Sequence, residues 1–330
     1  FDESVSKSTL MFCAGIGVAL IGGAGLYFTY KKFQKEAIPT KWIRVGEISD
    51  IICYPIKSCA PIRTKEIECS NIGLIKNYLR DRVFVVVTPN MRFVTARQHP
   101  RLVQIQPTFE DNSKFMVLSA PGMMDIKVDV AKLYETDSTI ANVWGDDVKA
   151  IDCGEEIAKW ISRFLLSEDT GFRLMFYPLD YTTRRIRANN APFDTYVQKD
   201  TGALHDATSF MLLCENSVAE LNSRIANPVT PLQFRPNFVV KGPYGFAEDS
   251  WKWIKIGENT IFKNVKPCTR CIFTTIDPET GIKSSDGEPL QTLRSFRLFP
   301  GRGLESPVLG IHLGVREKGT VRLGDHVYIG

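Results

Sequence analysis

The sequence predicts a mainly β fold with some α-helix, in two β-rich halves preceded by one transmembrane helix. Three observations support this prediction. Short runs of β-branched and aromatic residues alternate with turn residues over positions 38–330, a pattern typical of barrels and sandwiches. An amphipathic pattern over residues 155–166 predicts a helix. Near the start of the chain, residues 8–30 carry no charged side chain.

Composition places the chain among ordinary globular proteins. Its 330 residues are 44% hydrophobic and 24% charged, with a net charge of +4, so a sizeable core can form. No block rich in Lys and Arg contains interleaved aromatic residues, and we expect no nucleic-acid partner. The eight cysteines are spread along the chain without a disulfide framework. We interpret them as reduced thiols in a domain that faces the cytosol.

The uncharged stretch near the N-terminus predicts a membrane anchor. As a helix, residues 8–30 are long enough to span the roughly 30 Å hydrocarbon core of a bilayer. Lys31, Lys32 and Lys35 follow the stretch, and basic residues near a span stay on the cytoplasmic side. We therefore assign residues 1–37 to an anchor and a basic linker. A cleaved secretory signal is the alternative, and it fits less well because its basic residues would precede the apolar run.

Residues 38–175 form the first predicted β-rich half. We expect a helix over residues 155–166, because its apolar side chains recur at helical spacing. A hairpin tip is expected at residues 111–113. Strands are expected near residues 43–52, 83–87, 102–105, 115–118 and 126–130.

Residues 176–330 form the second half. A loop over residues 180–203 contains Arg184, Arg185 and Arg187, and loops of this length tend to be functional or mobile. A capping box at Ser217 predicts a helix through residue 225, and Pro289 predicts the start of another. Strands are expected at residues 238–240, 254–256 and 260–262, and a terminal hairpin at residues 320–323 and 326–329.

Two thiols, Cys268 and Cys271, bracket Arg270, and residues 272–276 are expected to form a strand because they are β-branched and apolar. A thioredoxin-like dithiol is disfavoured, since such a pair usually lies at a helix N-terminus. A structural zinc site is also disfavoured, because it needs four ligands and the histidines are scattered. Two interpretations stay open: a pair of ordinary buried cysteines, or one thiolate that ligates a soft or cofactor-borne metal.

Cationic residues lie beside several predicted strand ends. They are Lys57, the pair Arg80 and Arg82, Arg235, and Arg270 between the thiols. Each alone is more commonly a solvated surface charge. Together they are able to converge on one anionic ligand, because arginine pairs with phosphate in a bidentate manner.

Several separated motifs, in the same order, resemble one known family. The run that begins Lys266-Pro267-Cys268-Thr269-Arg270-Cys271 and ends at Gly281 closely resembles the signature of MOSC-domain molybdenum-cofactor proteins. Residues 54–59, 79–82, 94–98 and 234–237 resemble the rest of that pattern. With its N-terminal anchor, the whole chain is similar to the mitochondrial amidoxime-reducing components within that family.

The resemblance implies a MOSC N-terminal β-rich module over residues 38–175 and a MOSC β-barrel domain over residues 176–330. It implies a molybdenum–molybdopterin cofactor, with Cys271 as catalytic residue and metal ligand and Cys268 as a structural residue. At His312 an aromatic residue would be expected from the family pattern. The positions that would bind the cofactor are Lys57, Ser58, Arg82, Ala207, Thr208, Arg235, Asn237, Thr269, Arg270, Cys271 and His312.

The resemblance also implies an activity and partners. The family reduces small N-hydroxylated compounds such as amidoximes, hydroxylamines and N-oxides, with electrons from cytochrome b5 and NADH-cytochrome b5 reductase. It implies a single-pass protein of the mitochondrial outer membrane whose catalytic domain faces the cytosol. No G-x-G-x-x-G motif lies on a predicted strand–helix turn, so we expect no direct binding of NADH. A protein that carries sulfur or stores the cofactor without reductase turnover is the alternative.

Overall fold

Strands predominate over helices in this chain, as the sequence predicts. The structure, a computed structural model, describes residues 37–190, 193–300 and 304–330, and residues 42–330 form one structural unit. The predicted transmembrane span, residues 8–30, lies outside the described residues. Among the helices that are described, none is both long and apolar enough to cross a membrane.

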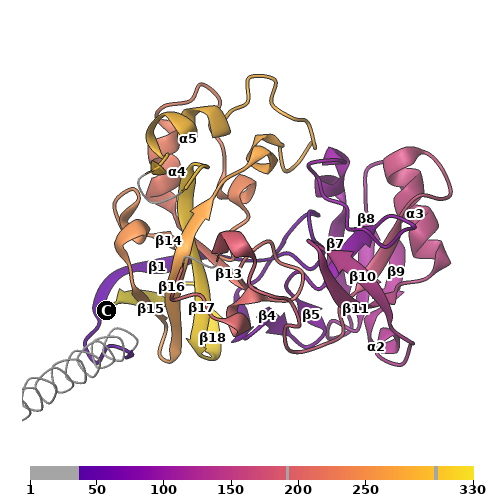
Figure 1. Ribbon diagram of the computed structural model, residues 1–330, viewed down its shortest axis with the longest axis horizontal. Helices are drawn as coiled ribbons and strands as arrows, with labels where there is room; N and C mark the ends of the chain where they lie inside the picture. The colour runs from indigo at the N-terminus through magenta and orange to yellow at the C-terminus, as the bar shows by residue number, and fades with distance from the viewer. Residues whose placement is uncertain (1–36, 191–192, 301–303) are drawn as a thin grey trace, which may run out of the picture. The chain divides into compact units, whose positions relative to one another are not determined.

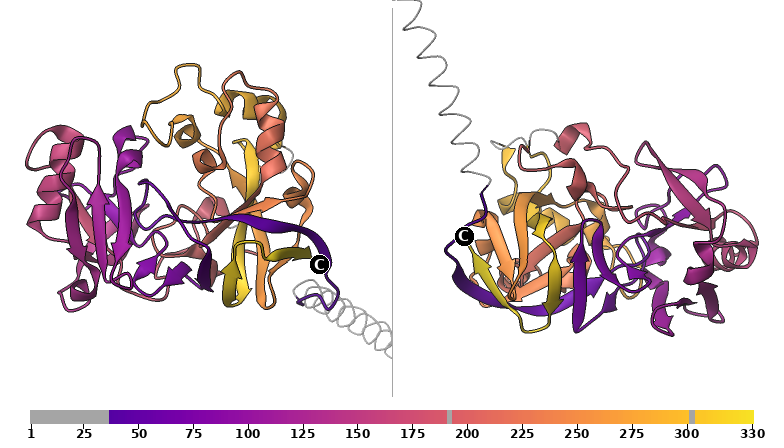
Figure 2. Two further views of the ribbon diagram at one scale, coloured as in Figure 1. Left: turned by 180° about the vertical axis from the view of Figure 1, so that it is seen from behind. Right: turned by 90° about the horizontal axis from the view of Figure 1, so that it is seen from below.

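Seven strands of the largest sheet close into a barrel, because β1 pairs with both β19 and β14. All neighbouring pairs are antiparallel except β13 and β14, which are parallel. Figure 1 shows the long strands of this barrel side by side, and Figure 2 shows β1, in indigo, running across to the orange and yellow strands. The barrel strands are β1 (Ile43–Cys53), β13 (Phe210–Cys214), β14 (Phe238–Lys241), β15 (Trp253–Ile256), β16 (Thr260–Thr269), β17 (Val308–Glu317) and β19 (His326–Ile329).

Aromatic side chains fill the barrel. Phe210, Phe238 and Phe262 are fully buried, and their ring centroids lie 5.1 to 6.0 Å apart. Such offset and edge-on contacts add to the stability that apolar burial provides. The short strand β2 (Ile62–Arg63) extends the sheet beyond β1. The interior of the barrel is therefore a packed core, and a ligand has to bind at its rim.

Smaller sheets make up the rest of the unit. In Figure 1, α3 (Glu155–Leu166) lies beside the strands β8 to β11. Its buried face carries Ile157, Trp160, Ile161 and Phe164, as its helical spacing predicts. The four-stranded sheets consist of β6 (Phe84–Val87), β10 (Thr139–Val143), β11 (Asp146–Asp152) and β12 (Arg173–Phe176), and of β3 (Glu66–Ser70), β4 (Gly73–Lys76), β5 (Leu79–Arg80) and β18 (Gly319–Arg322). The three-stranded sheet consists of β7 (Gln106–Glu110), β8 (Phe115–Ser119) and β9 (Ile126–Asp129), and α2 (Val130–Leu133) follows it.

Most predicted elements are confirmed, but several predictions are wrong. In place of the strand predicted at residues 102–105, residues 102–104 lie in a 3-10 helix, η1 (Pro100–Gln104), because Pro100 starts a helical turn. The helix predicted at Ser217 is α4 (Glu215–Asn222); it starts before Ser217, whose hydroxyl donates to Glu248 at 2.8 Å instead of capping. The terminal strands exist, yet they form no hairpin, since β18 pairs with β3 while β19 pairs with β1 and β15. The helix predicted after Pro289 is α5 (Leu290–Phe296).

The two predicted halves share backbone hydrogen bonds. β1 belongs to residues 38–175, yet it completes the barrel with strands of residues 176–330. The division at residue 175 stays a prediction. The arrangement has a consequence for function, because β1 ends at Cys53 and delivers the segment after it, residues 54–59, to the rim of the barrel.

Candidate cofactor-binding cleft

One cleft at the rim of the barrel brings together every predicted site residue. It leaves about 150 Å³ in which the centre of a water molecule fits, roughly tenfold the 10–15 Å³ that one water requires. Most of these residues lie in segments next to the ends of barrel strands. The predicted residues that line it are Lys57, Ser58, Arg82, Ala207, Thr208, Arg235, Asn237, Thr269, Arg270, Cys271 and His312.

Unusual backbone geometry directs three of these residues into the cleft. Ser58, Arg82 and Arg235 have φ angles of 70°, 48° and 54°, in the left-handed region that residues with a side chain seldom adopt. Such conformations persist only where surrounding contacts fix them, and they cluster at functional sites. The surrounding contacts are visible here, because Arg82 Nη2 donates to the Arg235 carbonyl at 3.0 Å.

The lining of the cleft is strongly cationic, with five Lys or Arg side chains and one carboxylate, Asp206. Arg270 is buried, and its Nε and Nη1 donate to the carbonyls of Leu309 and Phe234 at 2.9 and 2.8 Å. No carboxylate among the described residues forms an ion pair with Arg270. Burial lowers its pKa, which means that the site holds this positive charge at a cost. A bound anion would remove that cost.

Arg235 has a similar environment and a spare donor. Its Nη1 donates to the Cys59 carbonyl at 2.8 Å, and its guanidinium lies 4.0 Å from the centre of the Tyr54 ring. Burial lowers the pKa of Arg235 to about 10. Its Nη2 is buried and finds no hydrogen-bond partner in the part of the chain that the structure describes. Buried donors are normally paired, so this atom is suited to a ligand.

Asp81, which the sequence analysis did not select, organises the far side of the cleft. Its carboxylate is fully buried and accepts from the Tyr54 backbone N–H at 2.6 Å, from Asn237 Nδ2 at 3.1 Å, and from Arg82. His205 Nε2 lies 2.9 Å away. Burial alone would raise the pKa of Asp81, but Arg82 and His205 outweigh it and lower the pKa to about 2. This one carboxylate thus connects four segments of the chain. In the sequence, its position between Arg80 and Arg82 was the feature that could have marked it as a site residue.

Lys57 is neutralised inside the cleft. Its Nζ donates to the Leu204 carbonyl at 2.8 Å and forms an ion pair with Asp206. Burial lowers the pKa of Lys57 to about 8, although Asp206 opposes this shift. The same Asp206 carboxylate accepts the indole N–H of Trp144 at 3.0 Å. Neither Asp206 nor Trp144 was among the predicted site residues.

The two thiols differ in exposure, which separates the interpretations left open by the sequence. Cys268 is 5% exposed, and burial raises its pKa. Cys271 is exposed and lines the cleft. Arg97 Nη1 donates to Cys271 Sγ at 3.9 Å. A pair of ordinary buried cysteines is therefore excluded for Cys271, and one thiol of the pair is available to a ligand.

The strand predicted over residues 272–276 is wrong. A 3-10 helix, η6 (Ile272–Thr275), takes its place. The hydroxyls of Thr274 and Thr275 donate to the carbonyls three residues earlier, at 3.0 and 2.8 Å, and such local bonds compete with a strand ladder. The sequence analysis disfavoured a thioredoxin-like dithiol because it expected a strand after Cys271, and this reason no longer holds. The difference in burial between the two thiols takes its place as the argument against that dithiol.

His312, on β17, carries an acceptor into the cleft. The Thr208 hydroxyl donates to the Phe210 carbonyl at 2.8 Å, so His312 Nδ1, 2.9 Å from the same hydroxyl oxygen, has to be the donor there. Burial, together with Lys266 and Arg270, lowers the pKa of His312 well below its usual value. The neutral ring with its proton on Nδ1 leaves Nε2 as a hydrogen-bond acceptor.

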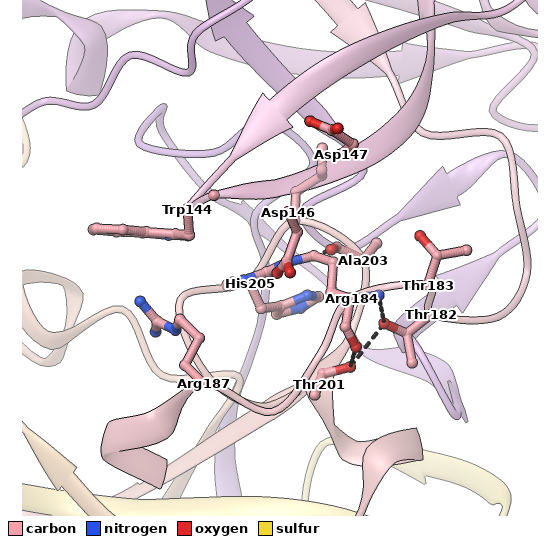
Figure 3. A network of polar contacts seen from close by, with 12 residues as sticks. Trp144, Asp146, Asp147, Thr182, Thr183, Arg184, Arg187, Thr201, Ala203 and His205 are labelled. Carbon is pink, nitrogen blue, oxygen red and sulfur yellow. Dashed lines mark hydrogen bonds and ion pairs between the residues drawn. The ribbon is translucent and has the colours of Figure 1, made fainter. Parts of the chain in front are cut away.

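The predicted loop, residues 180–203, contacts the same region. Arg184 is buried; its Nη1 donates to the Ala203 carbonyl at 3.3 Å, and its Nε pairs with Asp146 at 3.4 Å. Figure 3 shows Arg187 beside the ring of Trp144, and its guanidinium lies 4.9 Å from the ring centre. A role of this loop at a substrate entrance stays a prediction.

Comparisons with known proteins assign the family. The model of the MOSC N-terminal beta barrel domain matches residues 45–168, and that of the MOSC domain matches residues 199–328. Mitochondrial amidoxime-reducing component 1 of Danio rerio is 36% identical over 99% of this chain and 96% of its own length. Mitochondrial amidoxime-reducing component 1 of Mus musculus is 37% identical over 98% of this chain and 93% of its own length. Mitochondrial amidoxime reducing component 2 of Bos taurus is 37% identical over 86% of this chain and 83% of its own length. The chain belongs to the family of mitochondrial amidoxime-reducing components.

The side chains of the cleft fit the group that membership of this family implies, a metal carried on a pterin with a phosphate. Arg235 offers an unpaired buried donor, and Arg270 offers a charge without a carboxylate. Cys271 offers an exposed sulfur, a soft ligand suited to a soft metal centre. Among the described residues, no three His, Cys, Asp or Glu side chains gather as a metal site.

Proposed function

We propose that this chain is a molybdenum-cofactor-dependent reductase of N-hydroxylated compounds, namely amidoximes, hydroxylamines and N-oxides. One observation carries the proposal: an exposed thiol, that of Cys271, lines a cleft in which five cations face one carboxylate. Thiolate suits molybdenum, and arginine suits the phosphate of a pterin. The names of the relatives, amidoxime-reducing components, support the same activity.

The reaction would remove one oxygen atom from nitrogen. An N–O bond breaks, two electrons and two protons enter, and the products are the reduced nitrogen compound and water. The cofactor, when bound, supplies the two electrons and a place for the oxygen. Arg235 and Arg270 would hold its anionic end, and Cys271 would ligate its metal. His312 Nε2 would accept a hydrogen bond from the bound group, because its Nδ1 is already a donor to Thr208.

We further propose cytochrome b5, with NADH-cytochrome b5 reductase, as the electron source, and the mitochondrial outer membrane as the location. The uncharged residues 8–30 with Lys31, Lys32 and Lys35 after them favour a single-pass anchor whose catalytic domain faces the cytosol. The word mitochondrial in the names of the relatives supports the organelle. Partners anchored in the same membrane meet at raised effective concentration.

Metal and pterin analysis of the purified full chain, followed by an activity assay, tests the proposal. The expected result is molybdenum with a releasable pterin, and reduction of benzamidoxime with NADH, cytochrome b5 and its reductase. Molybdenum-loaded protein without turnover would favour a cofactor-storage or sulfur-carrying protein and overturn the reductase. Zinc or no metal, with no pterin released on denaturation, would overturn the cofactor assignment itself.

A further inference from the structure

A second pocket adjoins the cleft and shares two residues with it, Thr95 and Arg97. We call it the aromatic pocket, defined by Phe93, Trp144, Phe172 and His99 together with Thr95 and Arg97. Its rings form two close pairs: Phe93 and Trp144 have centroids 4.7 Å apart, and His99 and Phe172 have centroids 4.9 Å apart. The pocket therefore presents aromatic faces and edges to whatever enters it, next to the predicted reaction site.

Trp144 has an unfavourable backbone conformation, and its side chain is held at the border of the two pockets. It lies in the two-residue turn between β10 and β11, where Trp144 and Gly145 have φ angles of 58° and 86°. Such turns favour Asn or Gly at the first position, so a tryptophan there is strained. Its indole N–H donates to Asp206, which lines the cleft, at 3.0 Å. Figure 3 shows the ring nearly edge-on, with the guanidinium of Arg187 on the side of one ring face.

Arg97 connects the aromatic pocket to the thiol. Its guanidinium lies 4.9 Å from the Trp144 ring centre, and its Nη1 donates to Cys271 Sγ at 3.9 Å. No carboxylate among the described residues forms an ion pair with Arg97. A ligand in the aromatic pocket thus lies one side chain away from the sulfur, and the guanidinium is available to an electron-rich oxygen on that ligand.

We propose that the aromatic pocket binds the planar aromatic group of an N-hydroxylated substrate, with its N–O group directed past Arg97 towards Cys271. The inference rests on the proposed function. Aromatic rings prefer offset or edge-on partners, which Phe93 and Phe172 supply, and a guanidinium stacks on a π face. Small aliphatic substrates reach the cleft without this contact, so the pocket determines substrate preference and leaves the reaction itself unchanged.

Binding without turnover is the first test. Benzamidoxime and acetamidoxime are titrated by calorimetry into the purified full chain in the absence of any electron donor. We expect Phe93→Ala to weaken benzamidoxime about tenfold, the effect of losing an aromatic contact, and to leave acetamidoxime unchanged. Tyr78→Ala is the matched control, because Tyr78 is an aromatic residue that lines a different pocket. Equal weakening of both ligands, or no change in either, would overturn the proposal.

Turnover of the same two substrates with NADH, cytochrome b5 and its reductase is the second test. The ratio of kcat/KM for benzamidoxime to that for acetamidoxime should fall about tenfold in Phe93→Ala. Should Phe93→Ala fail to fold, Thr88→Phe, which adds bulk inside the pocket, should lower the same ratio. If wild-type protein reduces neither substrate, the proposed function fails, whereas unchanged ratios in active variants overturn the aromatic pocket alone.

Discussion

Four of the five cations of the cleft fall into two groups that are stabilised in different ways. Lys57 and Arg82 each form an ion pair with a carboxylate, Asp206 and Asp81 respectively. Arg235 and Arg270 instead donate to backbone carbonyls and pack against the rings of Tyr54 and Phe234. The first group is neutralised by the protein, and the second keeps its charge.

The difference indicates what each group does. An ion pair adds little net charge, and where a member is buried, as Lys57 and Asp81 are, the pair fixes the position of that member. A buried guanidinium held only by carbonyls and rings creates a positive potential that an anion can neutralise. We therefore assign Arg235 and Arg270 to holding an anionic ligand, and Lys57 and Arg82 to holding the walls around it. Four predictions test this division and the site around it, beginning with Cys271, which lines the same cleft as both groups.

The largest effect is expected at the thiol. Cys271→Ser should abolish amidoxime reduction and leave the fold and both groups of cations intact. Among the described residues, the exposed sulfur has a hydrogen-bond contact with Arg97 alone. Cys268→Ser should retain activity and lose some stability, since it places a hydroxyl in a buried position. Activity and thermal unfolding of both variants check this. Equal, complete loss of activity in the two would contradict the assignment of a single ligand.

The next effect concerns stability and separates the two groups. Arg82→Met leaves the fully buried Asp81 carboxylate without its ion-pair partner, and breaking a buried pair costs about 3–5 kcal/mol. Arg270→Met leaves only carbonyls unpaired, at about 1–3 kcal/mol, and removes a buried charge. Denaturant unfolding should therefore show the larger loss for Arg82→Met, whereas sulfate affinity should fall more for Arg270→Met. A larger loss of stability in Arg270→Met, or a larger loss of sulfate affinity in Arg82→Met, would contradict the division of the cations into two groups.

Part of the fold and of the cleft could be predicted from the sequence, and the reason why each part was predictable differs. The helix α3 follows from local periodicity, because its buried residues repeat at helical spacing. The strand β6 follows from a short continuous apolar run, and all four of its residues are buried. The eleven predicted residues of the cleft came from the resemblance to a known family, and the structure gathers all of them in one cleft. Spacing alone did not group them, since they belong to separate segments.

The missed residues depend on partners far along the chain. Asp81 contacts residues 27, 124 and 156 positions away in sequence, and no local pattern encodes such contacts. Trp144 was not selected as a site residue, since its partners Arg97, Arg187 and Asp206 lie in other segments. The terminal strands β18 and β19 show the same limit, because pattern predicts a strand and tertiary contacts choose its partner.

Acid sensitivity tests the Asp81 network. Burial lowers the pKa of His205 to about 4, below the value of about 6.5 for an unfolded chain. The unfolded chain therefore binds a proton between pH 6.5 and 4 that the folded chain does not. Its contribution to stability is complete above pH 6.5 and falls by up to about 3 kcal/mol as the pH drops towards 4. Urea unfolding at a series of pH values measures this loss. Between pH 6.5 and 4, the free energy of unfolding should fall less steeply in His205→Gln than in the wild-type protein. His312 is present in both proteins, so its contribution is the same in each.

The smallest effect is expected at Lys57, because Asp206 already neutralises it. Its pKa of about 8 means that the ammonium is charged below pH 8 and loses its proton above it. An anion binds the charged form better, so sulfate affinity should be full at pH 7 and fall a few-fold, on the order of 1 kcal/mol, by pH 9. Sulfate keeps a constant charge over this range, which removes titration of the ligand itself. In Lys57→Met, sulfate affinity should stay constant between pH 7 and pH 9, and at pH 7 it should be slightly below that of the wild-type protein. Arg235 and Arg270 would still supply most of the affinity. Parallel curves for the two proteins would show that another group titrates, and Lys57 would then belong with the structural ion pairs only.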